Sequence, residues 1–100
     1  MDVIFRTKKL EKFYKSYELG CRAWGLEVAR KFIQRVDLLQ EAADMAVVRN
    51  LPGLDCHRLR GPREGQFAVT LHARWRLIFT LAGEEAEIIC VEEVSKHYGD

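Results

Sequence analysis

Side chains that can transfer protons and bind phosphate are concentrated between residues 55 and 80. Imidazole titrates near neutral pH without a strong perturbation, and the planar guanidinium of arginine meets two phosphate oxygens at once. Between residues 56 and 80 there are two histidines and five arginines against one acid, Glu64. The cationic set is His57, Arg58, Arg60, Arg63, His72, Arg74 and Arg76. This composition predicts a surface that binds phosphate groups and moves protons.

Cleavage of RNA without a metal needs these kinds of side chain. A base takes the proton of the 2′-hydroxyl, cations stabilise the charge on the phosphate oxygens, and an acid protonates the leaving 5′-oxygen. His57 is the candidate base or acid, and Arg60 and Arg76 are candidates for binding the scissile phosphate. Candidates for the second proton donor are His72, His97 and Tyr98, the last also as a base stack. Further candidates for binding RNA are Arg58, Arg63, His72, Arg74 and Lys96.

Metal chemistry fits the sequence less well. Glu92 and Glu93 are adjacent, so we expect them on opposite faces of a continuous strand, and no histidine pair has ligand spacing on a helix. No phosphate-binding loop, dinucleotide fingerprint or nucleophile elbow is present. The three cysteines lack Cys-x-x-Cys spacing and are expected as buried hydrophobes, Cys56 included. We therefore expect neither a metal nor another cofactor.

The bulk composition is that of one ordinary globular domain, residues 1–100. The formal net charge of +1 hides an uneven distribution, because the basic segment is followed by an acidic one. The acids after residue 82 are Glu84, Glu85, Glu87, Glu92, Glu93 and Asp100. No apolar run is long enough for a signal peptide or a membrane span, so the sequence predicts a cytoplasmic protein without membrane contact.

The first half of the chain reads as a strand followed by two helices. Residues 3–5 are β-prone, and Thr7 is the predicted N-cap of a helix from Lys8 to Gly20. Residues 21–25 form a connector in which Trp24 fixes the turn. A second helix is predicted over residues 26–43, with an apolar stripe and with charged residues, Arg35 among them, largely off it.

The second half reads as strands. After the turn at residues 51–53 they are predicted at residues 57–59, 66–71, 74–81 and 86–94, joined by short turns. The apolar residues expected to face a core are Phe67, Val69, Leu71, Trp75, Leu77 and Phe79. The predicted class is α+β, a small antiparallel sheet with the N-terminal helical hairpin packed on one face and the other face left open.

A resemblance follows from the basic segment itself. The run His-Arg-Leu-Arg-Gly-Pro-Arg-Glu-Gly-Gln-Phe-Ala-Val, continued by Leu-His-Ala-Arg-Trp-Arg-Leu-Ile-Phe, resembles the HigB branch of the RelE/ParE toxin superfamily. The family pattern there is a His, then Leu-Lys-Gly-Asp-Arg-Glu-Gly, an aromatic strand and a Trp-Arg-Ile/Leu-x-Phe strand. Outside residues 57–79 the resemblance lies in the order of elements and the length.

The resemblance implies a toxin that enters the ribosomal A site and cuts the messenger RNA there. It implies a cognate helix-turn-helix antitoxin of the HigA kind, with operator DNA bound only through the complex of the two. Position by position, His57 falls on the family's catalytic His, Arg60 on its Lys of the Leu-Lys-Gly segment, and Arg76 on the Arg after the Trp. His72 falls where relatives often have another Arg.

The chain departs from the family at its end. Members of the branch commonly finish in an acidic residue followed by Tyr-His. Here Glu93 takes the acidic position, whereas Val94 and Ser95 take those of Tyr and His. We expect His97 and Tyr98 to supply the same chemistry from two residues further on, in swapped order.

Two other functions remain open from the sequence. One is a non-catalytic toxin of the ParE kind that blocks DNA gyrase, which needs no acid or base. The other is an inactive module that only binds the antitoxin, for which the altered C-terminal segment is the one support.

Overall fold

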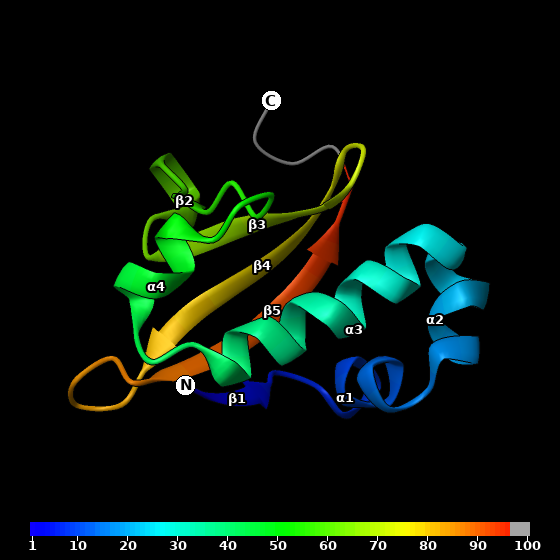
Figure 1. Cartoon of the computed structure of the whole chain (residues 1–100), viewed down its shortest axis with the longest axis horizontal. Coiled ribbons are helices and arrows are strands. Elements are labelled where there is room, and N and C mark those ends of the chain that lie inside the picture. Colours follow the sequence, from blue (N-terminus) through cyan, green and yellow to red (C-terminus); the bar gives the residue numbers. More distant parts are fainter. Residues whose placement is uncertain (97–100) are drawn as a thin grey trace.

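The computed structural model describes residues 1–96 and has the predicted α+β class (Figure 1). The strands are β1 (Asp2–Phe5), β2 (His57–Arg58), β3 (Gln66–His72), β4 (Trp75–Ala82) and β5 (Ile88–Ser95). The helices are α1 (Lys8–Lys15), α2 (Tyr17–Trp24), α3 (Leu26–Glu41), α4 (Met45–Asn50) and the 3₁₀ turn η1 (Gly61–Arg63). Within residues 1–96, no helix is long and apolar enough to cross a membrane.

The strands form one sheet in the order β1-β5-β4-β3-β2. From β2 to β5 it is the predicted antiparallel meander. The prediction of a purely antiparallel sheet is wrong at one edge, because β1 pairs with β5 in parallel. Parallel neighbouring strands need a long crossover connection. Here the connection consists of all the elements between the first strand, β1, and the last, β5. Strand propensity does not encode a pairing between segments so far apart.

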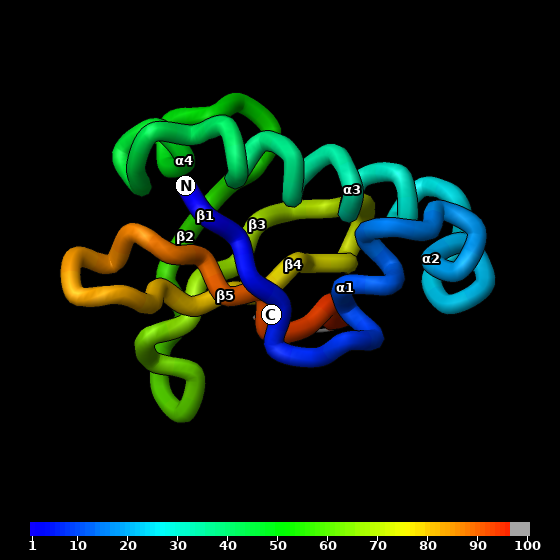
Figure 2. The backbone as a smooth tube through the Cα atoms, turned by 90° about the horizontal axis from the view of Figure 1, so that it is seen from below, coloured from blue at the N-terminus to red at the C-terminus, as the bar shows by residue number. Residues whose placement is uncertain are grey.

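The main core lies between α3 and one face of the sheet. Phe32, Val36 and Leu39 of α3 are fully buried there, as are Leu77 and Phe79 of β4. The other residues predicted to face the core also pack in it, namely Phe67, Val69, Leu71 and, partly buried, Trp75. Figure 2 shows α3 and α4 on one side of the sheet, with the turn after β2 projecting on the other side.

The single predicted helix over residues 8–20 is in fact two. Thr7 caps the first, as predicted, by accepting a hydrogen bond from Leu10 N at 3.1 Å. Ser16 then has extended backbone and ends α1, and its Oγ accepts from Leu19 N at 3.4 Å to begin α2. Serine is among the preferred N-cap residues, which is why the break falls there.

Gly20 does not end a helix, contrary to the prediction. It lies inside α2, is buried, and a Cβ built on it would lie 3.0 Å from Ala29 Cβ. The helix continues to Trp24, whose ring packs between Phe13 and Phe32 with centroids 4.4 and 5.1 Å away. Gly25, with φ at 88°, ends α2. Gly20 therefore serves close packing of α2 on α3.

Three further differences concern α3, α4 and the far face of the sheet. α3 ends at Glu41 rather than at residue 43, and its Arg35 is buried instead of lying on the solvated face. The short helix α4 has no counterpart among the predicted elements. The face away from α3 is not left open, because Leu59, Ala68 and Ile78 form a small buried cluster on it. The loop after β2 thus folds back over the sheet.

Candidate functional site

His57 lies at the start of the short strand β2, on the sheet edge opposite β1, and is exposed. Its Nδ1 is 3.0 Å from the carbonyl oxygen of Asp55. A carbonyl oxygen only accepts hydrogen bonds, so Nδ1 carries the proton and the neutral ring has its lone pair on Nε2. That tautomer is the one a general base acting through Nε2 requires.

The segment before His57 is fixed by the body of the protein. Leu54 is fully buried, and its carbonyl oxygen accepts a hydrogen bond from Thr70 N at 2.7 Å. Asp55 follows with φ at 48°, in the left-handed region that aspartate tolerates better than most residues. The turn this produces brings the Asp55 carbonyl back to the imidazole.

Arg60 joins His57 at this end of the sheet. Both line a hollow between β2, the η1 loop and the start of β3. The lining residues are His57, Arg58, Leu59, Arg60, Glu64, Gly65, Gln66, Phe67 and Leu81. Arg58 pairs with Phe67 in the ladder, and its guanidinium lies 5.5 Å from the Phe67 ring centroid, on the side of the sheet that carries the main core. His57 and Arg58 therefore point to opposite faces.

Arg76 lies near the other end of β3, at the turn that joins β3 to β4. Its Nη1 donates to the carbonyl oxygens of Ala73 at 2.7 Å and Trp75 at 3.0 Å. Lys96 places its ammonium 5.8 Å from the Trp75 ring centroid. The predicted residues His72 and Arg74 are exposed beside the same turn. These cations form a second group, separate from His57 and Arg60.

His57 and Arg76 share one face of the sheet. His57 pairs with Ala68, and Arg76 pairs with Thr70, two residues further along β3. β2 and β4 lie two strand spacings apart, on either side of β3, and their partner positions on β3 are two residues apart. The Cα atoms of His57 and Arg76 are therefore about 12 Å apart. The remaining predicted site residues, His97 and Tyr98, lie outside the described residues.

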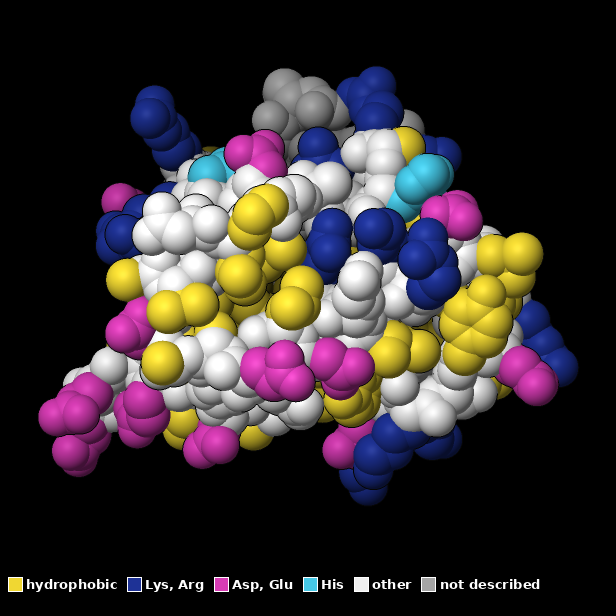
Figure 3. Space-filling model, viewed as in Figure 1, with side chains coloured by type: hydrophobic (Ala, Val, Ile, Leu, Met, Phe, Trp, Pro, Cys, Tyr) yellow, Lys and Arg dark blue, Asp and Glu magenta, His cyan; other side chains and the backbone are white. Residues whose placement is uncertain are grey.

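On the face seen in Figure 3, acidic side chains gather at the β4–β5 hairpin at the lower left, whereas cationic and histidine side chains lie along the top, with further cationic side chains across the middle and at the lower right and other acids between them. This agrees with the uneven charge distribution of the sequence. The acids of that hairpin, Glu84, Glu85 and Glu87, are exposed.

The prediction that Glu92 and Glu93 point to opposite faces is wrong. Ile78 pairs with Glu93 while the next residue, Phe79, pairs with Val91, so β5 carries a bulge. A bulge adds one residue to a strand and interrupts the alternation of its side chains. Both carboxylates consequently lie on the face away from α3.

Both carboxylates contact cations there. Glu92 pairs with Arg6 at 2.9 Å and accepts a hydrogen bond from Thr80 Oγ1 at 2.7 Å. Glu93 pairs with Arg63 of η1, also at 2.9 Å. Sequence reasoning missed these pairs. The sequence did contain a signal for the bulge. The core residues of β5 are two residues apart from Ile89 to Val91 but three apart from Val91 to Val94.

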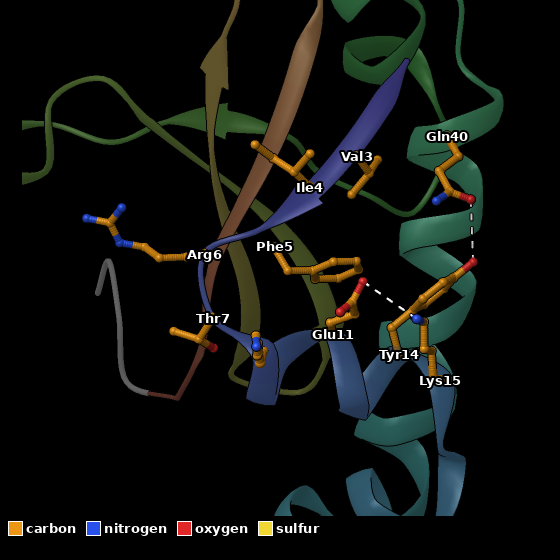
Figure 4. Close-up of a pocket in the computed structure, with 10 residues that line it drawn as sticks. Val3, Ile4, Phe5, Arg6, Thr7, Glu11, Tyr14, Lys15 and Gln40 are labelled. Atoms are coloured by element: carbon orange, nitrogen blue, oxygen red, sulfur yellow. Dashed lines mark hydrogen bonds and ion pairs between the residues drawn. The ribbon is translucent and has the colours of Figure 1, made fainter.

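A second hollow lies beside β1, between that strand, α1 and α3 (Figure 4). Tyr14 lines it, and its hydroxyl donates a hydrogen bond to Asp37 Oδ1 at 2.5 Å and lies 3.4 Å from Gln40 Oε1. Lys15 pairs with Glu11 at 3.7 Å. None of the predicted catalytic residues within 1–96 lines it. Among residues 1–96, no group of three or more His, Cys, Asp or Glu side chains is arranged to hold a metal ion.

Comparison with known proteins identifies the fold. No family model and no curated protein sequence matches the chain. In solved structures, 98% of the chain matches 100% of a YoeB/ParE toxin from Agrobacterium tumefaciens, at 16% identity and a TM-score of 0.63. The same share of the chain matches 98% of a chain in the YoeB–YefM complex from Staphylococcus aureus, at 12% identity and a TM-score of 0.63. It also matches 98% of a single-site variant of YafQ from E. coli, at 19% identity and a TM-score of 0.64. The chain has their fold.

The RelE/ParE-like fold predicted from the sequence is therefore confirmed, over nearly the whole length of the chain. At these identities the likeness concerns the fold.

Proposed function

We propose that this chain is the toxin of a type II toxin–antitoxin module, of the HigB branch, and that it cleaves messenger RNA during translation. The observation that carries the proposal is the state of His57. Its ring is exposed and donates its Nδ1–H to the Asp55 carbonyl at 3.0 Å, which puts the lone pair of the neutral imidazole on Nε2, the atom that takes the proton in the proposed reaction. The fold shared with a YoeB/ParE toxin and the sequence pattern over residues 57–79 support the same reading.

The reaction proposed is transfer within the RNA backbone. His57 Nε2 takes the proton of a 2′-hydroxyl, the 2′-oxygen attacks the adjacent phosphorus, and the bond to the 5′-oxygen breaks as that oxygen is protonated. Arg60 binds the phosphate and stabilises the charge that develops on it. Arg76 joins it by exchanging the carbonyls of Ala73 and Trp75 for phosphate oxygens. His97 or Tyr98 is the proposed second proton donor.

The proposed partners follow from the charge on the surface. Arg58, Arg63, His72, Arg74 and Lys96 are proposed to bind ribosomal or messenger RNA, together with the exposed lysines of α1. Contacts with phosphates release counterions, so binding should weaken steeply as salt rises. A cognate helix-turn-helix antitoxin is proposed to neutralise the toxin, with operator DNA bound through the complex, in the cytoplasm.

The test is to express the chain without an antitoxin and to map messenger 5′ ends during growth arrest. His57→Ala is compared with the parent and with Glu84→Ala, an exposed change on the β4–β5 hairpin. New ends within translated codons, present in the parent and in Glu84→Ala but absent in His57→Ala, are the expected result.

The other outcomes assign other functions. Arrest with intact messengers and damaged DNA would replace the proposal with a gyrase inhibitor of the ParE kind. Normal growth without an antitoxin would leave a module that only binds its partner. Cell killing by His57→Ala equal to the parent would remove His57 from the mechanism.

A further inference from the structure

Arg35 is a buried cation that the proposed reaction does not use. The residue is 7% exposed, and burial lowers the pKa of its guanidinium. Among residues 1–96, its polar contacts are to neutral oxygens: Nε to Thr70 O at 3.0 Å, Nη1 to Gln34 Oε1 at 3.3 Å and Nη2 to Gly53 O at 3.4 Å. A well-packed apolar side chain often stabilises such a position equally well. Packing alone therefore does not account for a guanidinium here.

The oxygens that Arg35 binds belong to the two segments that hold His57. Thr70 lies on β3, and its N–H donates to Leu54 O at 2.7 Å. Gly53 immediately precedes Leu54 in the loop that leads to β2. The planar guanidinium thus binds β3 through Nε and the loop through Nη2. Together with the Thr70–Leu54 bond it fixes residues 53–54 against the sheet.

Asp55 connects this anchor to the imidazole. Its φ of 48° is a backbone conformation that persists in a non-glycine residue where the surroundings hold it. The residue before it is fully buried and anchored, and its own carbonyl oxygen accepts from His57 Nδ1. A shift of residues 53–54 would turn that carbonyl away from the ring, and Nδ1 would lose its acceptor.

We propose that Arg35 is a positioning residue, which holds the Asp55 carbonyl in place and so sets the tautomer and the direction of the His57 ring. The proposal rests on the proposed function in one respect, the use of His57 Nε2 as the base. The structural part, the dependence of the His57 tautomer on Arg35, holds or fails without any RNA.

The experiment measures the His57 ring nitrogens by NMR in the purified full chain at a pH where the imidazole is neutral. Arg35→Met keeps the length of the side chain and removes its donors, and Arg35→Lys keeps the charge and removes the fork. Val36→Ala is the matched control, because Val36 is the next residue of α3, is fully buried and packs in the main core. Cleavage of ribosome-bound messenger is measured on the same samples.

The parent and Val36→Ala should show His57 protonated at Nδ1, whereas Arg35→Met should show a mixture of both tautomers. Cleavage by Arg35→Met should fall at least tenfold, with Arg35→Lys intermediate. A His57 that remains Nδ1-protonated in Arg35→Met overturns the proposal. If Arg35→Met does not fold, an unchanged tautomer in Arg35→Lys overturns it equally. A changed tautomer in a chain whose parent cleaves nothing would support the positioning role and reject the proposed function.

Discussion

Arg63 and Glu93 join the loop after β2 to the last strand of the sheet, with Nη1 and Oε1 2.9 Å apart. Arg63 Nη1 also donates to Gln66 Oε1 at 3.0 Å, so one side chain spans from β3 to β5. The contact with Glu93 is an ion pair rather than a well-directed hydrogen bond, because Glu93 Oε1 accepts none within the described residues. The loop that carries Arg60 is consequently held over the far face of the sheet.

A double-mutant cycle on Arg63→Ala and Glu93→Gln measures this link. Both side chains are partly exposed, so we expect a coupling free energy of about 0.5–1 kcal/mol in urea unfolding at low salt. Because salt screens charges near the surface, the coupling should shrink in about 1 M salt. If the two single effects add within about 0.3 kcal/mol, the pair does not stabilise the loop.

Gly20→Ala should destabilise the protein, although alanine is the better helix former. Alanine gains about 1 kcal/mol in a helix interior, but the new Cβ would lie 3.0 Å from Ala29 Cβ and 3.6 Å from its Cα. Those atoms are fixed to the backbone of α3 and cannot rotate away. Overpacking costs about 1–3 kcal/mol, so the net loss should be about 1 kcal/mol, measured by urea unfolding.

Ala29→Gly provides the control for Gly20→Ala. The double variant moves the missing methyl group from α2 to α3 and restores the space between the helices. It should be more stable than the sum of the two single effects. Strict additivity would show that Gly20 has no packing role.

The sequence predicted the elements that depend on local pattern. Thr7 caps α1, and the alternation from Phe67 to Phe79 places the core face of β3 and β4 correctly. It could not predict features set by distant contacts. A glycine at position 20 is typical of a helix end, and only its contact with Ala29 of α3 explains it inside a helix. The pairing of β1 with β5 likewise depends on the tertiary structure.

The same division applies to the candidate site. The residue types indicated His57, Arg60 and Arg76, but not that His57 and Arg76 lie on one face of the sheet with their Cα atoms about 12 Å apart. Arg35 looked like one more charge on a solvated helix, because burial of a cation against backbone carbonyls leaves no mark in periodicity. Positioning residues are therefore the part of a site that patterns reveal least.

Ala73→Gly should stabilise the turn between β3 and β4. Ala73 has φ at 51°, which costs an alanine about 1–2 kcal/mol, whereas glycine loses about 0.5–1 kcal/mol of extra entropy on folding. A net gain of about 0.5–1 kcal/mol in urea unfolding is expected. Ala23→Gly, exposed in α2, is the control and should lose about 1 kcal/mol. Equal losses in both variants would contradict the role assigned to the backbone at Ala73.

We expect the free energy of unfolding to decrease at alkaline pH, in part because the Cys56 thiol titrates there. Burial raises the pKa of the Cys56 thiol, and burial followed by Glu92 raises that of Cys90. The folded chain then retains thiol protons at pH values where the unfolded chain has lost them. The stability from this source is complete below the ordinary thiol pKa of about 8.5 and is lost as pH rises through the folded pKa.

Urea unfolding between about pH 8 and pH 10 tests this expectation, because a decline in unfolding free energy should begin there. Cys56→Ala removes one of the titrating groups and should make the decline shallower, even if it lowers stability at every pH. Val48→Ala removes buried volume from α4 without removing a titrating group, so its decline should parallel that of the parent. A decline of equal slope in Cys56→Ala and the parent would show that Cys56 is not a source of the pH dependence.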